Sequence, residues 1–374
     1  MFVIKGQYNE AKVFVSELEE TARDQIQNLV NQPFIAGSKI RVMPDVHAGA
    51  GSTIGTTMTI TDKVVPNLVG VDIGCGMLTC ELAGLTETDL DYPRLDRLIR
   101  AQIPSGYRIR RKPHAFTEQT QLFDLRCREG GRNDNHLKLD RALLSIGTLG
   151  GGNHFIEINR DRDGKLYLVI HSGSRHLGLQ VALYYQRLAA GLQPKMERDL
   201  AYLEGAPMDD YLHDMKIMQD YAVRNRKAMA EIILTGMDWQ ASSRFTTIHN
   251  YIELETMILR KGAISARAGE MVLIPLNMRD GSLLCVGKGN PDWNFSAPHG
   301  AGRIMSRNEA KRVLTLRDFQ SSMEGIYTTS IRKDTLDEAP MAYKSLDSLT
   351  EYLDQTVDIL HHLTPIYNFK AGGN

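Results

Sequence analysis

An aspartate and a cysteine stand three residues apart in a glycine-rich segment of this chain. Asp72 and Cys75 lie in the run NLVGVDIGCGM, where glycines occupy positions 70, 74 and 76. The apolar residues that open this run predict a buried strand, and the glycines predict a tight turn directly after it. Such a turn could aim a carboxylate and a thiolate at one metal ion. The segment alone leaves open the alternative of a buried cysteine beside an aspartate that caps the turn.

Four of the eleven histidines share a similar setting. His154 follows three glycines, His171 ends an apolar run, His249 lies in TIHNYI, and His299 lies in SAPHGAGR. Strand ends and glycine turns let imidazole rings converge, and glycine-rich turns expose backbone N–H groups that bind phosphate oxygens. Together with the turn described above, these histidines predict a combined metal and phosphate site.

The mixture of one thiolate, one carboxylate and several imidazoles limits the choice of metal. It is compatible with manganese, zinc, cobalt or iron, and it is unlike a magnesium or calcium site. A thiolate can bridge two ions, and paired ions can hold both ends of an in-line displacement at phosphorus. The residue types leave the number of ions open. The chain has no G-x-x-x-x-G-K-[ST] loop, no H-E-x-x-H motif and no Lys-x-Asp-Gly, the usual motif of a lysine that attacks a nucleotide.

These side chains must be positioned by a mixed set of strands and helices. Helical spacing predicts helices over residues 89–103, 181–192 and 209–234, a first helix with a capping box at Ser16 and Glu19, and a last helix inside residues 345–363. Apolar runs predict strands within residues 39–60, 165–174, 269–278 and 282–290. Because the two signals do not alternate regularly, we expect an α+β fold, with mixed β-sheets flanked by helices in one compact domain over residues 1–374.

The composition is that of an ordinary globular protein. The chain has 374 residues, of which 42% are hydrophobic and 24% charged, with a formal net charge of -1. A binding site for a polyanion therefore requires local clustering of basic residues. The first residues do not have the pattern of a secretory signal, and no apolar run reaches the length of a membrane span. The four cysteines form no C-x-x-C pair, so we expect reduced thiols and a cytoplasmic protein with no membrane association.

Eight segments, read together, resemble the RtcB family of RNA ligases. They are MPDVHAGAGSTIG, GVDIGCGM, GTLGGGNHFIE, HSGSRHLG, HNY, RKGAISARAGE, SAPHGAGRIMSR and PMAYK, in family order from about Arg41 to Lys344. In that family a histidine takes GMP from GTP with manganese bound alongside. The GMP passes to an RNA 3′-phosphate, which is formed by opening a 2′,3′-cyclic phosphate where necessary, and a 5′-hydroxyl then attacks and expels GMP.

The resemblance therefore implies an RtcB-like domain with a GTP-dependent RNA ligase activity in tRNA splicing or RNA repair. It implies two Mn²⁺ ions, for which Zn²⁺ or Co²⁺ could substitute, and GTP as cofactors. The implied partners are RNA with a 3′-phosphate or 2′,3′-cyclic phosphate end, RNA with a 5′-hydroxyl end, and an archease-type activator. Two alternatives remain, namely a metal-dependent RNA-end phosphatase or cyclic phosphodiesterase, and a non-catalytic RNA-binding paralogue.

The resemblance also assigns roles to individual positions. His299 is the expected nucleophile, and Asp45 is the acceptor expected to orient it. The expected metal ligands are Asp72, Cys75, His154, His171 and His249, with Cys75 bridging two ions. The expected nucleotide contacts are Asn153, His154, Phe155, Ile156, Glu157, His249, Asn250, Pro275, Met278, Ser282, His299, Gly300, Ala301, Gly302 and Lys370. The expected RNA contacts are Arg175, Arg303, Arg108, Arg110 and Arg111, the last three with a solvated loop as the alternative.

One segment departs from the family pattern. The family's nucleotide loop reads Pro-Gly-Ser-Met-Gly, whereas this chain has PLNMRDGS from Pro275 to Ser282. Leu276 has a Cβ where the family has none, so either its backbone avoids a positive φ or the loop follows a different path. This departure leaves open how the guanosine is held and how strongly GTP is preferred.

Overall fold

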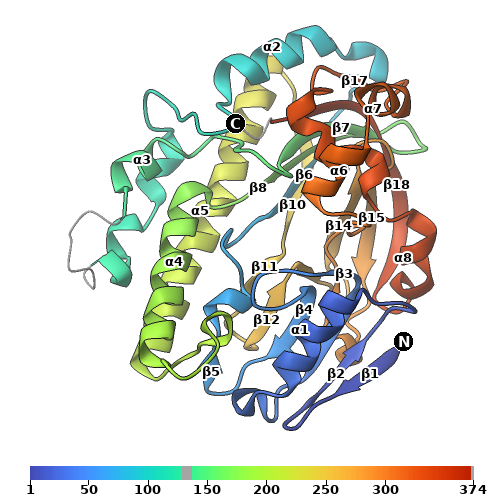
Figure 1. Cartoon of the computed structure of the whole chain (residues 1–374). Helices are drawn as coiled ribbons and strands as arrows, with labels where there is room; N and C mark the ends of the chain where they lie inside the picture. Colours follow the sequence, from blue (N-terminus) through green and yellow to red (C-terminus); the bar gives the residue numbers. More distant parts are fainter. Residues whose placement is uncertain (129–136, 372–374) are drawn as a thin grey trace.

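Two β-sheets of unequal size form the framework of the protein (Figure 1). The structure is a computed structural model that describes residues 1–128 and 137–371. The smaller sheet has six strands in the order β1-β2-β3-β4-β12-β11. These strands are β1 (Phe2–Lys5), β2 (Glu10–Val13), β3 (Ile40–His47), β4 (Ile54–Thr59), β11 (Asn250–Glu253) and β12 (Ile258–Lys261).

The larger sheet has eight strands, seven of them in the order β10-β6-β8-β7-β18-β15-β14, with β17 paired to β18. Its strands are β6 (Gly76–Leu82), β7 (Phe155–Arg160), β8 (Leu166–Ser172), β10 (Ala241–Ile248), β14 (Met271–Asn277), β15 (Gly281–Gly287), β17 (Tyr327–Thr328) and β18 (Val357–Lys370). Two short pairs complete the strands, β5 (Lys63–Val64) with β9 (Leu203–Glu204), and β13 (Ala263–Ser265) with β16 (Ser296–Pro298).

Helices cover these sheets. They are α1 (Glu20–Val30), α2 (Tyr92–Gln102), α3 (Leu139–Leu143), α4 (Arg175–Leu192), α5 (Ala206–Met237), α6 (Arg307–Val313), α7 (Leu316–Ser322) and α8 (Leu346–Leu353). The longest, α5, packs on β6 and β8 and runs beside α4 (Figure 1). Its methionines, such as Met215, Met218 and Met229, are buried in the core. The α+β fold class predicted from the sequence is confirmed, while the extent of a single domain over residues 1–374 stays a prediction.

The last helix, α8, lies inside residues 345–363 as predicted, and the β-branched and apolar run at residues 357–363 belongs to β18, because it pairs with β15. Two local predictions were wrong. The strand at the glycine-rich segment follows the turn instead of preceding it, so that β6 begins at Gly76 and Val71 is 45% exposed. The first helix begins at Glu20 without the capping box expected at Ser16.

None of the helices in residues 1–128 and 137–371 has the length and apolar character needed to cross a membrane.

Candidate metal and nucleotide site

The predicted ligands come together at one end of four neighbouring strands. In the antiparallel register, Gly76 of β6 pairs with Ser172 of β8 and with Ile248 of β10, and Phe155 of β7 pairs with His171 of β8. The starts of β6 and β7 therefore lie beside the ends of β8 and β10. Cys75, His154 and His249 each stand one residue beyond such a strand end, which is why residues far apart in the sequence converge here.

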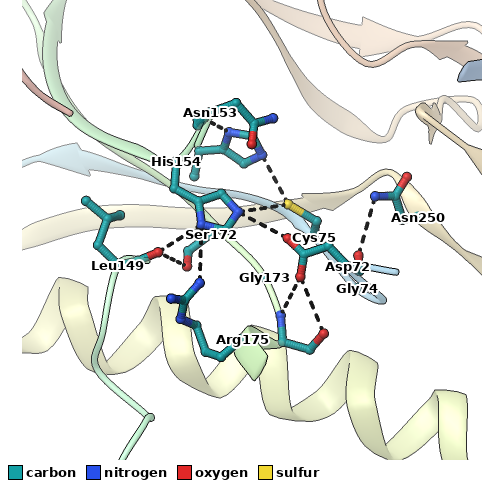
Figure 2. Close-up of polar contacts among 12 residues, drawn as sticks. Asp72, Gly74, Cys75, Leu149, Asn153, His154, Ser172, Gly173, Arg175 and Asn250 are labelled. Carbon is teal, nitrogen blue, oxygen red and sulfur yellow. Dashed lines mark hydrogen bonds and ion pairs between the residues drawn. The ribbon is translucent and has the colours of Figure 1, made fainter. Parts of the chain in front are cut away.

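Cys75 is at the centre of this group. Its Sγ lies 3.2 Å from Nε2 of His171 and 3.5 Å from Nε2 of His154. The same Nε2 of His154 lies 3.1 Å from a carboxylate oxygen of Asp72 (Figure 2). The His249 ring follows, with its centre 5.2 Å from that of His171. The structure thus brings all five expected ligands together.

The Nδ1 contacts of His154 and His171 fix the ring orientation in which Nε2 faces Cys75. Nδ1 of His154 lies 2.9 Å from the carbonyl oxygen of Leu149, and Nδ1 of His171 lies 3.2 Å from that of Asn153. A carbonyl only accepts hydrogen bonds, so each Nδ1 carries the proton and each Nε2 keeps its lone pair. Both lone pairs point toward Cys75, as metal-ligating imidazoles require.

The donor set fits two divalent ions. Ligand atoms of Cys75, His171 and His249 lie within 4.8 Å of one another, and so do those of Asp72, Cys75 and His154. Burial lowers the pKa of His171 and of His249 well below the usual value, so both imidazoles are neutral and able to ligate. Burial and the Asp72 charge raise the pKa of the Cys75 thiol, so a bound cation is needed to stabilise the thiolate. Cys75 belongs to both groups, as a thiolate shared by two ions would have to.

A fourth imidazole stands beside this centre with its own orienting acid. The His299 ring centre lies 4.9 Å from that of His249. Its Nδ1 is 2.6 Å from Oδ2 of Asp45, and its backbone N–H donates to the same oxygen at 3.1 Å. Asp45 comes from β3 and is fully buried, whereas His299 directly follows β16. The carboxylate therefore holds the proton on Nδ1 and leaves the Nε2 lone pair for attack.

Both the nucleophile candidate and the metal centre open into one cavity of about 420 Å³. Twelve of the predicted nucleotide contacts line it, namely Asn153, Phe155, Glu157, His249, Asn250, Pro275, Met278, His299, Gly300, Ala301, Gly302 and Lys370. Burial raises the pKa of Glu157 to about 7, although hydrogen bonds from Asn368 and Asn159 and the Lys370 charge oppose the shift. The cavity thus holds a carboxylate that changes charge near neutral pH.

Comparison with known proteins identifies the family of this chain. The family model described as "tRNA-splicing ligase RtcB" matches residues 25–371. The chain belongs to the RtcB family. It is 35% identical to the RNA-splicing ligase RtcB of Escherichia coli K12, with 95% of each chain covered. It is 30% identical to the RNA-splicing ligase RtcB of Mycobacterium tuberculosis H37Rv, covering 89% of this chain and 96% of the relative. It is also 29% identical to RNA-splicing ligase RtcB2 of Escherichia coli ATCC 25922, covering 95% and 93%.

Three of the nucleotide contacts expected from the RtcB resemblance do not line the cavity. His154 lies in the metal group behind it. Ile156 is buried in the core, because alternation along β7 places it on the face opposite Phe155 and Glu157. Ser282 is fully buried in β15, where it pairs with Pro275 of β14. Sequence reasoning assigned whole motifs, whereas strand alternation exposes only every second side chain.

Five titratable side chains that line the cavity were missed. They are His47, Lys261, Arg307, Glu338 and Tyr343. All of them except Glu338 stand inside the quoted RtcB segments, so the segments carried a signal that residue-by-residue transfer did not use.

The unusual nucleotide loop forms the hairpin turn between β14 and β15, with a register shift between Pro275 and Asn277. Leu276 has no positive φ, its side chain is 4% exposed, and it belongs to the same buried cluster as Ala301. Asn277 accepts hydrogen bonds from the backbone N–H groups of Arg279 and Asp280, and Gly281 takes the left-handed conformation with φ +73. The first of the two expected alternatives therefore holds: the backbone of Leu276 avoids a positive φ.

The arginines predicted to bind RNA lie in different settings. Arg175 and Arg108 line a second cavity of about 540 Å³ together with Lys138, Arg141 and the 80% exposed Tyr107. Val71 and Asp72 line both cavities, so the second one lies directly beside the metal group.

The remaining three arginines do not line the second cavity. The guanidinium of Arg110 donates to the carbonyl of Gln102, and Arg111 is exposed. Arg303 lines the nucleotide cavity, but its guanidinium donates to Met305 O, Tyr343 Oη and Asp337 O. Arg303 is thus held by the protein itself.

Proposed function

We propose that this chain is a GTP- and manganese-dependent RNA ligase that joins 3′-phosphate or 2′,3′-cyclic phosphate ends to 5′-hydroxyl ends. The observation that carries this proposal is the His299–Asp45 pair beside the Cys75-centred donor group, in a cavity of nucleotide size. Membership of the RtcB family, whose relatives are named RNA-splicing ligases, supports the same activity.

The chemistry begins at His299. Its Nε2 lone pair forms a bond to the α-phosphorus of GTP while the bond from that phosphorus to the β-phosphate oxygen breaks, and pyrophosphate leaves with the electron pair. The Asp45 carboxylate stabilises the positive charge that develops on the ring through Nδ1. The resulting N–P bond makes GMP available for transfer to an RNA 3′-phosphate.

The cavity wall formed by β7 suits a guanine base. Glu157 is 2% exposed and lines the cavity beside Phe155. Its carboxylate can accept from N1–H and the 2-amino group of guanine, whereas adenine has neither donor at these positions. A preference for GTP therefore follows from Glu157 even though the PLNMRDGS loop departs from the family pattern.

Asp72, Cys75, His154, His171 and His249 would hold the two ions. When bound, they neutralise phosphate charge and polarise the phosphorus centres. The mixed donor set suits manganese, and zinc or cobalt could substitute.

The second cavity supports RNA binding. Arg108, Lys138, Arg141 and Arg175 provide cations for backbone phosphates, and Tyr107 offers an exposed ring on which a base can stack. Arg175 lies closest to the chemistry, because its Nη1 is 3.4 Å from Nδ1 of His154. An archease-type activator and a cytoplasmic location stay predictions from the sequence.

A covalent adduct tests the proposal. The chain is incubated with α-labelled GTP and Mn²⁺ and then separated by denaturing electrophoresis, where an acid-labile labelled band is expected. His299→Ala should abolish the band, and His114→Ala, which lies outside both cavities, should keep it. End-labelled RNA that loses its 3′-phosphate without GTP and is never joined would instead favour the phosphatase alternative.

A further inference from the structure

Arg226 is a buried arginine behind the metal group that no predicted role has used. It lies on α5, the helix that packs on β6 and β8, and it is 0% exposed. Its Nη1 donates to the carbonyl of Gly74 at 2.9 Å and to the carbonyl of Ser172 at 2.8 Å. Its Nη2 donates to Oγ1 of Thr246 in β10 at 3.3 Å. One side chain therefore ties the turn before β6 to β8 and β10.

Two of these contacts directly adjoin residues that are expected to bind metal. The carbonyl of Gly74 belongs to the peptide bond that leads into Cys75. The carbonyl of Ser172 belongs to the residue that directly follows His171. Because both carbonyls accept from the same nitrogen, Nη1 of Arg226 fixes the position of one ligand-bearing segment relative to the other.

The turn that carries Cys75 is also held on its other side. The backbone N–H of His249 donates to the carbonyl of Cys75 at 3.0 Å, and the N–H of Gly74 donates to the carbonyl of Asn250 at 2.8 Å. The turn lies flat against α5, because a Cβ at Gly74 would stand 2.8 Å from Cα of Gln219. The two peptide groups that flank Cys75 are therefore both fixed, and together they determine the direction of its Cα–Cβ bond.

Arg226 has no acidic partner that would explain its burial. Among the described side chains of residues 1–128 and 137–371, no carboxylate oxygen lies within 4.0 Å of its guanidinium. Arginine stays charged in proteins, and a buried charge without a counter-ion is less favourable for folding than an apolar side chain of similar size. The stability of the fold therefore gives no reason for an arginine here, whereas the alignment of the ligand-bearing segments does.

We propose that Arg226 is a positioning residue that holds Cys75 between the two ligand groups before any metal ion binds. This inference rests on the metal site of the proposed function. The Cys75 sulfur must stay within reach of His171 and His249 on one side and of Asp72 on the other, so a rotation of the turn would remove it from one group. The contact of Arg226 with the peptide before Cys75 opposes this rotation.

Cobalt binding tests the position of the Cys75 sulfur, because a thiolate bound to Co²⁺ gives a charge-transfer band in the near ultraviolet. When the metal-free chain is titrated with Co²⁺, we expect Arg226→Gln to bind about ten- to a hundredfold more weakly, the usual loss when a group that orients a ligand is removed. The band should also be weaker at equal occupancy. Arg226→Lys keeps a charged donor for the two carbonyls and should recover most of the affinity and of the band. Unchanged affinity and an unchanged band in Arg226→Gln would overturn the proposal.

Arg260→Gln is the matched control. Arg260 is also 0% exposed, and its guanidinium donates to the carbonyls of Asn294 and Phe295 at 3.4 Å, but none of its hydrogen-bond partners directly adjoins an expected metal ligand. The control should lower the midpoint of thermal unfolding, as Arg226→Gln does, and should keep the cobalt band. Loss of the band in both variants would attribute it to general loosening of the core and would refute a specific role of Arg226.

A measurement on the unaltered chain covers the case in which Arg226→Gln does not fold. The backbone N–H groups of Gly74 and Cys75 donate to the carbonyls of Asn250 and Asp72. Amide hydrogen exchange read by mass spectrometry should show these two N–H groups equally protected with and without Mn²⁺, because protein contacts alone hold the turn. Protection that develops only when Mn²⁺ is added would contradict a turn that is held before metal binding.

The ligase function and the role of Arg226 can fail separately. If the unaltered chain gives the cobalt band but forms no adduct with GMP, the proposed ligase function fails and the positioning role of Arg226 stands. If the adduct forms and Arg226→Gln keeps the full cobalt band, the positioning role fails and the ligase function stands.

Discussion

Replacing Asp45 by asparagine tests the link between the buried carboxylate and the nucleophile. Asn has nearly the same shape as Asp, so the packing around β3 is kept while the charge is lost. In the native protein one oxygen of Asp45 accepts from Nδ1–H of His299 at 2.6 Å and from its backbone N–H at 3.1 Å. An amide that turns its NH₂ group toward Nδ1 would place the ring proton on Nε2 and so remove the attacking lone pair.

The size of the effect follows from the burial of this contact. A hydrogen bond to a charged group contributes about 1.5–3 kcal/mol, which is about a 10- to 150-fold change in rate if it is lost in the transition state. The change of tautomer adds to this, and the same substitution at the triad aspartate of a serine protease costs about 10⁴-fold. Because Asp45 is 0% exposed and water does not replace it, we expect adduct formation to slow by about 10²- to 10⁴-fold.

The assay is the single-turnover rate of labelled GMP transfer from GTP to the protein. Metal content and thermal unfolding are measured on the same sample, so that loss of the nucleophile's orientation is distinguished from loss of metal or of folding. Asp292→Asn is the control, because Asp292 also pairs with a residue of β3, Arg41, but lies outside the cavity. An Asp45→Asn rate within about threefold of the unaltered chain would refute the orienting role.

Three further predictions concern the metals, the base and the RNA. Because Cys75 belongs to both ligand groups and His154 to one, Cys75→Ala should remove both manganese ions and His154→Ala only one. Elemental analysis measures the manganese content of each variant, and an equal loss of manganese in the two variants would contradict a bridging role of Cys75. Burial raises the pKa of Glu157 to about 7 from 4.5, so its carboxyl stabilises the fold by about 3 kcal/mol below pH 4.5, and this contribution is lost as the pH rises to 7. The affinity for GTP has the opposite pH dependence and falls as the pH drops below 7, because the protonated carboxyl accepts less well from guanine. Glu157→Gln should flatten both pH profiles, that of stability measured by thermal unfolding and that of GTP affinity measured by titration. Gly150 has a φ of +87, and in Gly150→Ala the new Cβ would stand 1.9 Å from Nη1 of Arg175, so the Arg175 side chain must move. We expect the rate of RNA joining to fall at least tenfold while the adduct with GMP still forms, which separate assays of joining and of adduct formation would show.

The sequence predicted the site better than it predicted the local elements around it. Glycine-rich turns and the apolar runs beside them indicated strand ends at His154, His171 and Cys75, and all three residues lie at strand ends. The order of turn and strand near Cys75 was wrong, because a short apolar run before glycines looks the same whether it forms a strand or an exposed turn. The last helix was predicted only to lie inside residues 345–363, and it is pairing with β15 that makes residues 357–363 a strand.

The sequence by itself determined the donor chemistry: a single thiolate, a carboxylate and several imidazoles in glycine-rich settings, carried in RtcB-family motifs. The residue types alone did not distinguish the four imidazoles, and in the sequence only the RtcB resemblance separated His299 from His154, His171 and His249. Asp45, 254 residues from His299, fixes the orientation of one ring, whereas the carbonyls of Leu149 and Asn153 turn two others toward Cys75. Only the tertiary structure decided these ring orientations, because the protonation of a buried imidazole depends on the groups that folding brings around it.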